Sequence, residues 1–187
     1  MDRAQTGKRG RLVQSAVKLV HEQGFHRTTL ADIAREADVP LGNVYYYFKT
    51  KDELGRALIE EQATRQEGLR RAWESPGDPR AELDAFITMT LDNRASLARS
   101  GCPIGTLCGE LGKDGGPLAE NAGGLFTGIL TWLTDRFRAL GKGDESRDLA
   151  VHLLSALQGA SLLTHTFGDP DFVQGEAERL RQWLTTL

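Results

Sequence analysis

Apolar residues recur every three or four positions along most of this chain, and polar or glycine-containing segments interrupt them at intervals. Such spacing places the apolar side chains on one face of a helix. The first stripe consists of Leu12, Val13, Ala16, Val17 and Val20. The alternation typical of strands and the Asn-Gly or Asp-Gly signals of hairpins are absent between the apolar runs of the sequence. The pattern therefore predicts an all-α fold of about nine helices.

Four helices are predicted in the first part of the chain. They span residues 8–23, 30–37, 43–48 and 51–73. Gly24 ends the first helix, and Thr28 or Thr29 caps the second. The break at 38–42 contains a proline and a glycine, and Thr50 caps the fourth helix. Three short helices with a Pro/Gly turn before the third are typical of a helix-turn-helix unit.

Five further helices are predicted beyond residue 75. The segments that bound them are 75–79, 100–103, 112–117, 141–144 and 168–170. Between residues 149 and 163, the eighth helix has apolar residues around most of its circumference. The ninth carries a near-heptad seam of Val173, Ala177, Leu180, Leu184 and Leu187. These features fit either a deep core or half of a helix-pair dimer interface.

The charge is divided unevenly between the two parts of the chain. Residues 1–51 hold nine of the 23 basic and five of the 26 acidic residues, so a basic head precedes an acidic body. This division fits a DNA-binding end joined to a domain with another task, or chance variation along the chain. The sequence has no signal-peptide pattern at its start and no apolar run of membrane-spanning length. Its two cysteines make no disulfide framework.

An aromatic run at Tyr45-Tyr46-Tyr47-Phe48 follows the Pro/Gly turn. Consecutive helical residues point about 100° apart, so the run cannot lie entirely in a core. We assign Phe48 and part of Tyr45 to the core. In a helix-turn-helix unit the start of the second helix reads base edges in the major groove. The candidate base-reading residues are Leu41, Gly42, Asn43 and Tyr45. The candidate phosphate ligands are Thr29, Tyr46, Tyr47 and Lys51.

The segments 28–34, 39–48 and 51–54 together resemble the N-terminal domain of the TetR family of transcriptional repressors. The resemblance implies a helix-turn-helix DNA-binding domain at 6–66, with the motif at about 29–48, and a ligand-binding and dimerisation domain at 67–187. It also implies a homodimer that uses the last two helices, binds a palindromic double-stranded operator in the bacterial cytoplasm, and responds to a small molecule.

Two positions depart from the pattern of this family. Tyr47 stands where many members have His, so it can bond a phosphate but cannot carry a positive charge. Asn43 stands where Ser or Thr is frequent, which alters the expected base preference. Repression rather than activation is implied by the resemblance alone.

The segment Gly101-Cys102-Pro103 resembles the sixth-helix entrance of a TetR subgroup in which some members sense electrophiles or quinones. Pro103 suits the first position of a helix, so Cys102 is expected at its N-cap, where a thiolate is favoured. Cys108 lies six residues on, too far along a regular helix for an undistorted disulfide with Cys102. Both cysteines also fit simple packing positions.

A reversible effector would need an apolar cleft with a few polar groups. The candidate lining residues are Phe86, Met89, Leu107, Phe126, Leu130, Trp132, His152 and His165. Thr90, Asn93 and Gln158 are candidate polar groups. The sequence offers no catalytic set, phosphate loop, metal-ligand spacing or cofactor motif, which leaves an enzyme or a helical interaction protein without DNA as remote alternatives.

Overall fold

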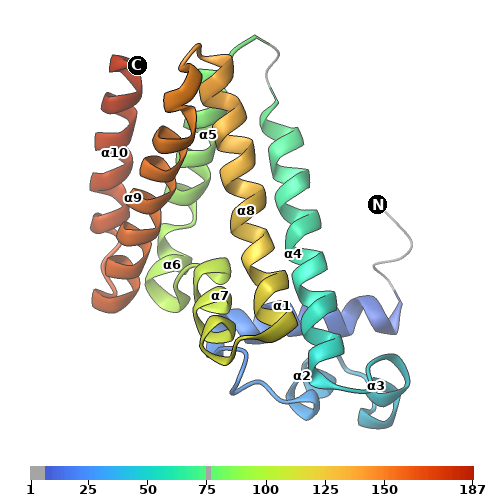
Figure 1. Cartoon of the computed structure of the whole chain (residues 1–187). Helices are drawn as coiled ribbons and strands as arrows, with labels where there is room; N and C mark the ends of the chain where they lie inside the picture. Colours follow the sequence, from blue (N-terminus) through green and yellow to red (C-terminus); the bar gives the residue numbers. More distant parts are fainter. Residues whose placement is uncertain (1–6, 75–76) are drawn as a thin grey trace. The chain divides into compact units, whose positions relative to one another are not determined.

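The computed structural model describes residues 7–74 and 77–187, and its regular elements there are all helical (Figure 1). The first four α-helices are α1 (Lys8–Gln23), α2 (Leu30–Glu36), α3 (Leu41–Tyr47) and α4 (Lys51–Trp73). The next four are α5 (Pro79–Asp92), α6 (Arg94–Ser100), α7 (Pro103–Asp114) and α8 (Gly116–Ala139). A short 3-10 turn, η2 (Gly143–Glu145), precedes α9 (Ser146–Phe167) and α10 (Asp171–Thr186). The predicted all-α fold is confirmed.

Three predicted boundaries differ from the structure. Helix α3 begins at Leu41, because Pro40 serves as its N-cap and its carbonyl accepts a hydrogen bond from the Asn43 amide at 2.8 Å. The predicted fifth helix is divided in two at Asn93, between α5 and α6. The predicted loop at 112–117 is mostly helical, and Gly115 alone separates α7 from α8 with a φ of 70°.

The chain divides into two compact units by its internal packing. Of the described residues, 7–66 pack with 103–125, and 67–74 and 77–102 pack with 126–187. Helix α7 and the start of α8 therefore pack with the first three helices, although they follow α5 and α6 in the sequence. The functional division between 6–66 and 67–187 stays a prediction. Its start at residue 6 and residues 75–76 of the predicted break lie outside the described residues.

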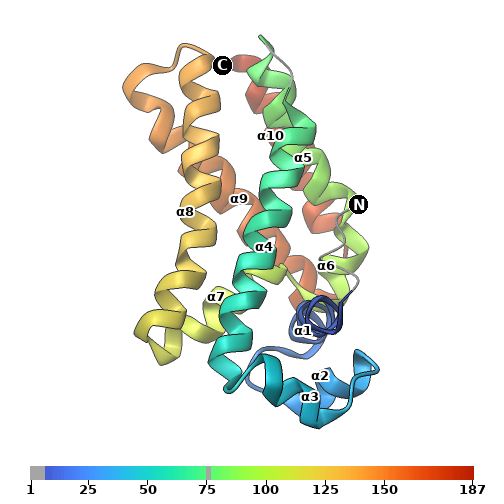
Figure 2. The ribbon, with the colours of Figure 1, turned by 90° about the vertical axis from the view of Figure 1, so that its right-hand side faces the viewer.

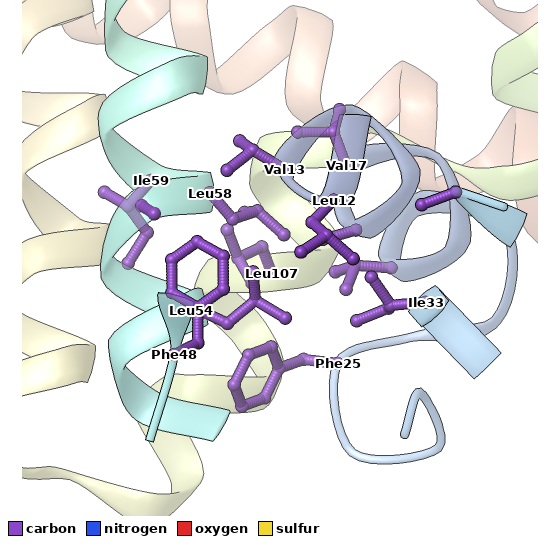
Figure 3. Packing of buried hydrophobic residues seen from close by; sticks show 14 of the residues in the cluster. Leu12, Val13, Val17, Phe25, Ile33, Phe48, Leu54, Leu58, Ile59 and Leu107 are labelled. Carbon is purple, nitrogen blue, oxygen red and sulfur yellow. The ribbon is translucent and has the colours of Figure 1, made fainter. Parts of the chain in front are cut away.

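The first unit has one apolar core (Figure 3). The predicted stripe of α1 is confirmed, since all five of its residues are buried. The labelled side chains that meet it come from α2, α4 and α7 and from the segments that follow α1 and α3. They are Ile33, Leu54, Leu58, Ile59, Leu107, Phe25 and Phe48. Burial of these residues fixes α2 and α3 against α1 and leaves their outer faces free.

The second unit is built around α9 and α10. Helix α10 packs along both α9 and α5, and α6 packs against α9 (Figure 2). The seam predicted on the last helix is buried within this unit at Val173, Ala177, Leu180 and Leu184. Polar contacts add to the packing, because the Arg181 guanidinium donates to Asp84 and Thr88 of α5 at 2.8 and 2.7 Å. No helix in the described ranges combines the length and the apolar character that a membrane crossing requires.

Candidate nucleic-acid interface and effector region

A capping box at Thr29 fixes the start of α2. The Thr29 hydroxyl accepts a hydrogen bond from the Asp32 amide at 3.1 Å, and the Asp32 carboxylate accepts one from the Thr29 amide at 3.1 Å. The hydroxyl also donates to that carboxylate at 2.6 Å. These bonds from Thr29 are the main cause that lowers the pKa of Asp32. The Thr29 side chain is exposed, so it is a helix cap that still faces outward.

Helix α3 presents most of its aromatic side chains outward. Tyr46 is 75% exposed and Tyr45 is 49% exposed, and Leu41 at the start of the helix is 42% exposed. Val44 is buried and anchors the helix to the first core. Three neighbouring outward-facing side chains on a short helix are unusual for a surface without a partner.

The tyrosine that packs inward is not the one that the sequence predicted. Phe48 is buried, as predicted. Tyr47, rather than Tyr45, is half-buried against the core of the first unit. Its ring meets that of Tyr46 edge to face, with 5.0 Å between the centroids. Tyr45 is thus free for a partner over much of its surface, and the packing of Tyr47 holds Tyr46 in place.

The start of α3 is open to a partner. A Cβ added at Gly42 would meet no atom within 4 Å, so internal packing does not require a glycine there. The missing side chain lets another molecule approach the first turn closely. Asn43 follows it and is half-buried. The side-chain amide of an asparagine offers both a donor and an acceptor, the pair that an adenine edge requires.

Lys51 and Lys49 both make internal contacts near this surface. The Lys51 ammonium donates to the His26 carbonyl at 3.0 Å and lies 4.7 Å from the centroid of the Phe25 ring. Burial lowers the pKa of Lys51, and the Glu110 and Asp52 carboxylates offset part of this effect. The Lys49 ammonium donates to the Tyr45 carbonyl at 2.8 Å.

The candidate effector residues are not brought together as one set. Phe86 of α5 meets Trp73 and Trp132, with ring centroids 6.2 Å apart in both pairs. Half-buried side chains of the same unit are Met89, Phe126 and Leu130. Leu107 belongs instead to the core of the first unit, where it is 1% exposed. Its apolar character, which suggested a cleft wall, is explained by that core.

The candidate polar groups are largely engaged or outward-facing. The Thr90 hydroxyl and the Asn93 side-chain amide donate to the Phe86 and Met89 carbonyls at 3.3 and 2.7 Å. His152 and His165 are exposed on α9. The His152 ring meets that of Trp183 at 4.8 Å, and the His165 ring lies 3.4 Å from the Ala98 carbonyl. Within the described ranges, no three His, Cys, Asp or Glu residues are grouped so that they could hold a metal ion.

Both cysteines are present as thiols, and both are half-buried. Cys102 directly precedes α7, as predicted, and packs against the cluster formed by Leu97, Ala160 and Val173. The Cys108 thiol donates to the Ala122 carbonyl at 3.2 Å and packs against the first core.

The sequence predicted that α9 is apolar around most of its circumference, as deep core or as part of a dimer interface; in the structure α9 has both buried residues and an exposed apolar surface. Leu162 and Phe167 are each 65% exposed, and Leu163 is also exposed. Phe167 stacks on Phe172 at the start of α10, with 5.4 Å between the ring centroids. We call these four residues and Val151, also exposed, the α9 surface. The signal was present in the sequence, since α9 has more apolar residues than one buried face can hold.

Comparisons with known proteins agree for both parts of the chain. Residues 12–58 match the family described as bacterial regulatory proteins, tetR family, and 79–175 match the LmrA/YxaF-like C-terminal domain of transcriptional regulators. The HTH-type transcriptional regulator Rv0196 of Mycobacterium tuberculosis is 31% identical over 173 residues, 87% of each chain. YxaF of Bacillus subtilis, another HTH-type regulator, is 26% identical over 170 residues, 86% of each chain. A TetR regulator from Legionella pneumophila has the same fold, with a TM-score of 0.81 at 22% identity over 95% of this chain and 97% of its own.

Proposed function

Since the chain belongs to the TetR family of transcriptional regulators, with an LmrA/YxaF-like C-terminal domain, we propose that it is a repressor of the bacterial cytoplasm whose α3 helix reads a palindromic operator. The observation that carries this proposal is the outward-facing surface of α3, with Tyr46 75% exposed beside an open Gly42. Regulators of this family bind operator DNA and are not enzymes.

The proposed DNA-binding residues divide into two groups. Leu41, Gly42, Asn43 and Tyr45 meet base edges, because they lie at or near the start of α3. Thr29, Tyr46, Tyr47 and Lys51 meet phosphates through hydroxyl and ammonium groups. For Thr29 to do so, its hydroxyl hydrogen turns from the Asp32 carboxylate to the phosphate. For Lys51 to do so, its ammonium turns away from the His26 carbonyl or donates a second hydrogen to the phosphate, since it carries three.

We propose that the homodimer forms through the α9 surface and the adjoining face of α10. The predicted seam of α10 supports this less than expected, because its side chains are buried inside their own unit. The exposed residues Leu162, Phe167 and Phe172 are instead the apolar groups available to a second copy. A dimer places two copies of α3 on successive major-groove faces if they are about 34–36 Å apart.

We further propose that a small molecule binds in the second unit and releases the operator. The rings of Trp73, Phe86 and Trp132 favour an apolar or aromatic ligand, with Met89, Phe126 and Leu130 beside them as candidates. A ligand that favours another separation of the two α3 helices lowers operator affinity.

Cys102 supports an alternative way in which the operator could be released, by chemical modification of a thiol. Its position directly before α7 agrees with the electrophile-sensing subgroup that the sequence resembles, so alkylation or oxidation of this thiol could replace a reversible ligand. We expect N-ethylmaleimide to release the wild type from its operator and to leave Cys102→Ser bound, with Cys108→Ser as the matched control. Equal release of wild type and Cys102→Ser would exclude the alternative.

Selection of genomic fragments followed by footprinting tests the main proposal. We expect the wild-type protein to retain a fragment with a protected palindrome and to lose affinity steeply as salt rises. Retention of no fragment, or binding without a protected palindrome, would contradict it.

A further inference from the structure

Two carboxylates of α7 face the turn between α1 and α2. One Glu110 oxygen accepts a hydrogen bond from the His26 amide at 3.1 Å. An Asp114 oxygen, four residues further along α7, lies 3.1 Å from Nε2 of the His26 imidazole. Residues four apart share one face of a helix, so both carboxylates belong to a single edge of α7. This contact lies entirely within the first unit.

The turn is shaped to receive the Glu110 carboxylate. Gly24 has a φ of 89°, a region that residues with side chains rarely adopt. A Cβ at this position would lie 2.5 Å from a Glu110 oxygen, closer than non-bonded atoms approach. Glycine therefore serves the contact twice, by allowing the backbone conformation and by leaving room for the carboxylate.

The same turn also holds Lys51, through the second backbone polar group of His26. The His26 amide donates to the Glu110 carboxylate, and the His26 carbonyl accepts a hydrogen bond from the Lys51 ammonium at 3.0 Å. Phe25, the residue before it, supplies the ring under that ammonium. Glu110 and Lys51 are therefore linked through the backbone of a single residue, His26.

We propose that Glu110 is a positioning residue for operator binding, which holds the α1–α2 turn so that Lys51 is presented to a phosphate. The inference rests on the proposed function and adds to it a residue that does not meet DNA: Glu110 of α7 sets the position of Lys51 through the backbone of His26.

Operator affinity of the full-length chain tests this coupling. The variants are Glu110→Ala, Glu110→Gln, Lys51→Met and the double variant Glu110→Ala/Lys51→Met, on the duplex retained by wild type. Glu120→Ala, an exposed glutamate of α8 in the same unit, is the matched control. Fluorescence anisotropy at several salt concentrations gives each dissociation constant and its salt dependence.

We expect Glu110→Ala to weaken binding about tenfold, as for the loss of a hydrogen bond to a charged group. Glu110→Gln should retain much of the affinity, because its amide oxygen still accepts from the His26 amide. Lys51→Met should reduce the slope of the logarithm of the affinity against the logarithm of the salt concentration. The expected reduction is about 0.9 for each phosphate that no longer contacts an ammonium. The double variant should match Lys51→Met alone, since Glu110 acts through Lys51.

The proposal would be overturned if Glu110→Ala bound the operator as tightly as wild type. It would also be overturned if the loss of affinity in the double variant equalled the product of the losses in the two single variants. Equal losses in Glu110→Ala and Glu120→Ala would do the same, because the loss would then not depend on the contact of Glu110 with His26. If Glu110→Ala does not fold, Glu110→Gln replaces it in the comparison. The proposal then requires that Glu110→Gln binds the operator more weakly than wild type, and that Glu110→Gln/Lys51→Met binds as tightly as Lys51→Met alone. Retention of no duplex by wild type would overturn the proposed function together with this inference, whereas normal wild-type binding with unaffected variants overturns the inference alone.

Discussion

Helices α3 and α9 both leave large apolar side chains exposed, but the groups around those side chains differ. On α3, Tyr45 and Tyr46 carry hydroxyls, and Asn43 and Lys49 lie beside them. On α9, the exposed side chains of Leu162 and Phe167 have no polar atoms. A surface that combines rings, hydroxyls and lysines suits a nucleic acid, whereas the mainly apolar α9 surface, with the exposed His165 and Thr166 as its polar neighbours, suits another protein face. The chemistry beside an exposed ring thus indicates its partner better than the exposure does.

The largest expected effect comes from charge on the α9 surface. Leu162→Asp combined with Phe167→Asp should give single chains of 20.5 kDa in place of dimers, because two buried carboxylates per copy oppose association. Operator affinity should fall roughly 100-fold or more as the second half-site is lost. Sedimentation and anisotropy measure both quantities, and Leu162→Met with Phe167→Leu is the apolar control. A double aspartate variant that remains a dimer would place the interface elsewhere.

The next largest effect is expected on α3, where removal of the Asn43 side chain tests base recognition. Asn43→Ala should relax the choice of one base pair in each half-site by about 1–3 kcal/mol, the value of a good bidentate contact. Binding to unrelated DNA and the dimer mass should remain as in wild type. Operators with single base-pair changes show which position is relaxed. A uniform loss on all sequences would indicate that Asn43 only supports the helix.

The Tyr46 hydroxyl should contribute less. Tyr46→Phe should weaken operator binding about fivefold, the value of one hydrogen bond worth about 1 kcal/mol. Its salt slope should not change, since a neutral hydroxyl displaces no counterion. Anisotropy over a salt series measures both. If the slope changed with the affinity, Tyr46 would be acting through a neighbouring cation.

Loss of the α2 cap is the smallest expected effect. Thr29→Ala should lower the midpoint of thermal unfolding by about 2–4 °C, as for a cap worth about 1 kcal/mol. The pKa of Asp32 is lowered in the folded chain, so its contribution to stability is present at neutral pH and is lost as pH falls through that pKa. Thr29→Ala should return the pKa of Asp32 toward its ordinary value, which carboxyl NMR titration measures. An unchanged pKa would show that the backbone amide of residue 29 and Arg35 determine it without the Thr29 hydroxyl.

Much of the fold could be read from the sequence because its signals are local. The apolar stripe of α1, the stop at Gly24 and a cap at Thr28 or Thr29 each depend on residues a few positions apart. The structure confirms the stripe and the stop, and of the two threonines Thr29 is the cap. The break at Asn93 was missed because the apolar pattern continues across it. The loop predicted at 112–117 was wrong because glycine permits a turn without requiring one.

The details of the site depend on contacts between distant residues. Sequence alone does not show that Tyr47 rather than Tyr45 packs inward, since the angle of α3 on its core decides this. The contact of Glu110 with His26 joins positions 84 residues apart. Leu107 looked like a cleft wall because core and cleft residues are equally apolar, and only its burial beside α1 separates them.

The mass of the complex with the selected duplex tests the central claim most directly. Native mass spectrometry should show two chains on each palindromic duplex, and footprinting should show both half-sites protected with centres about 34–36 Å apart. A single chain on each duplex, or no stable complex with any selected fragment, would contradict a dimeric operator-binding regulator.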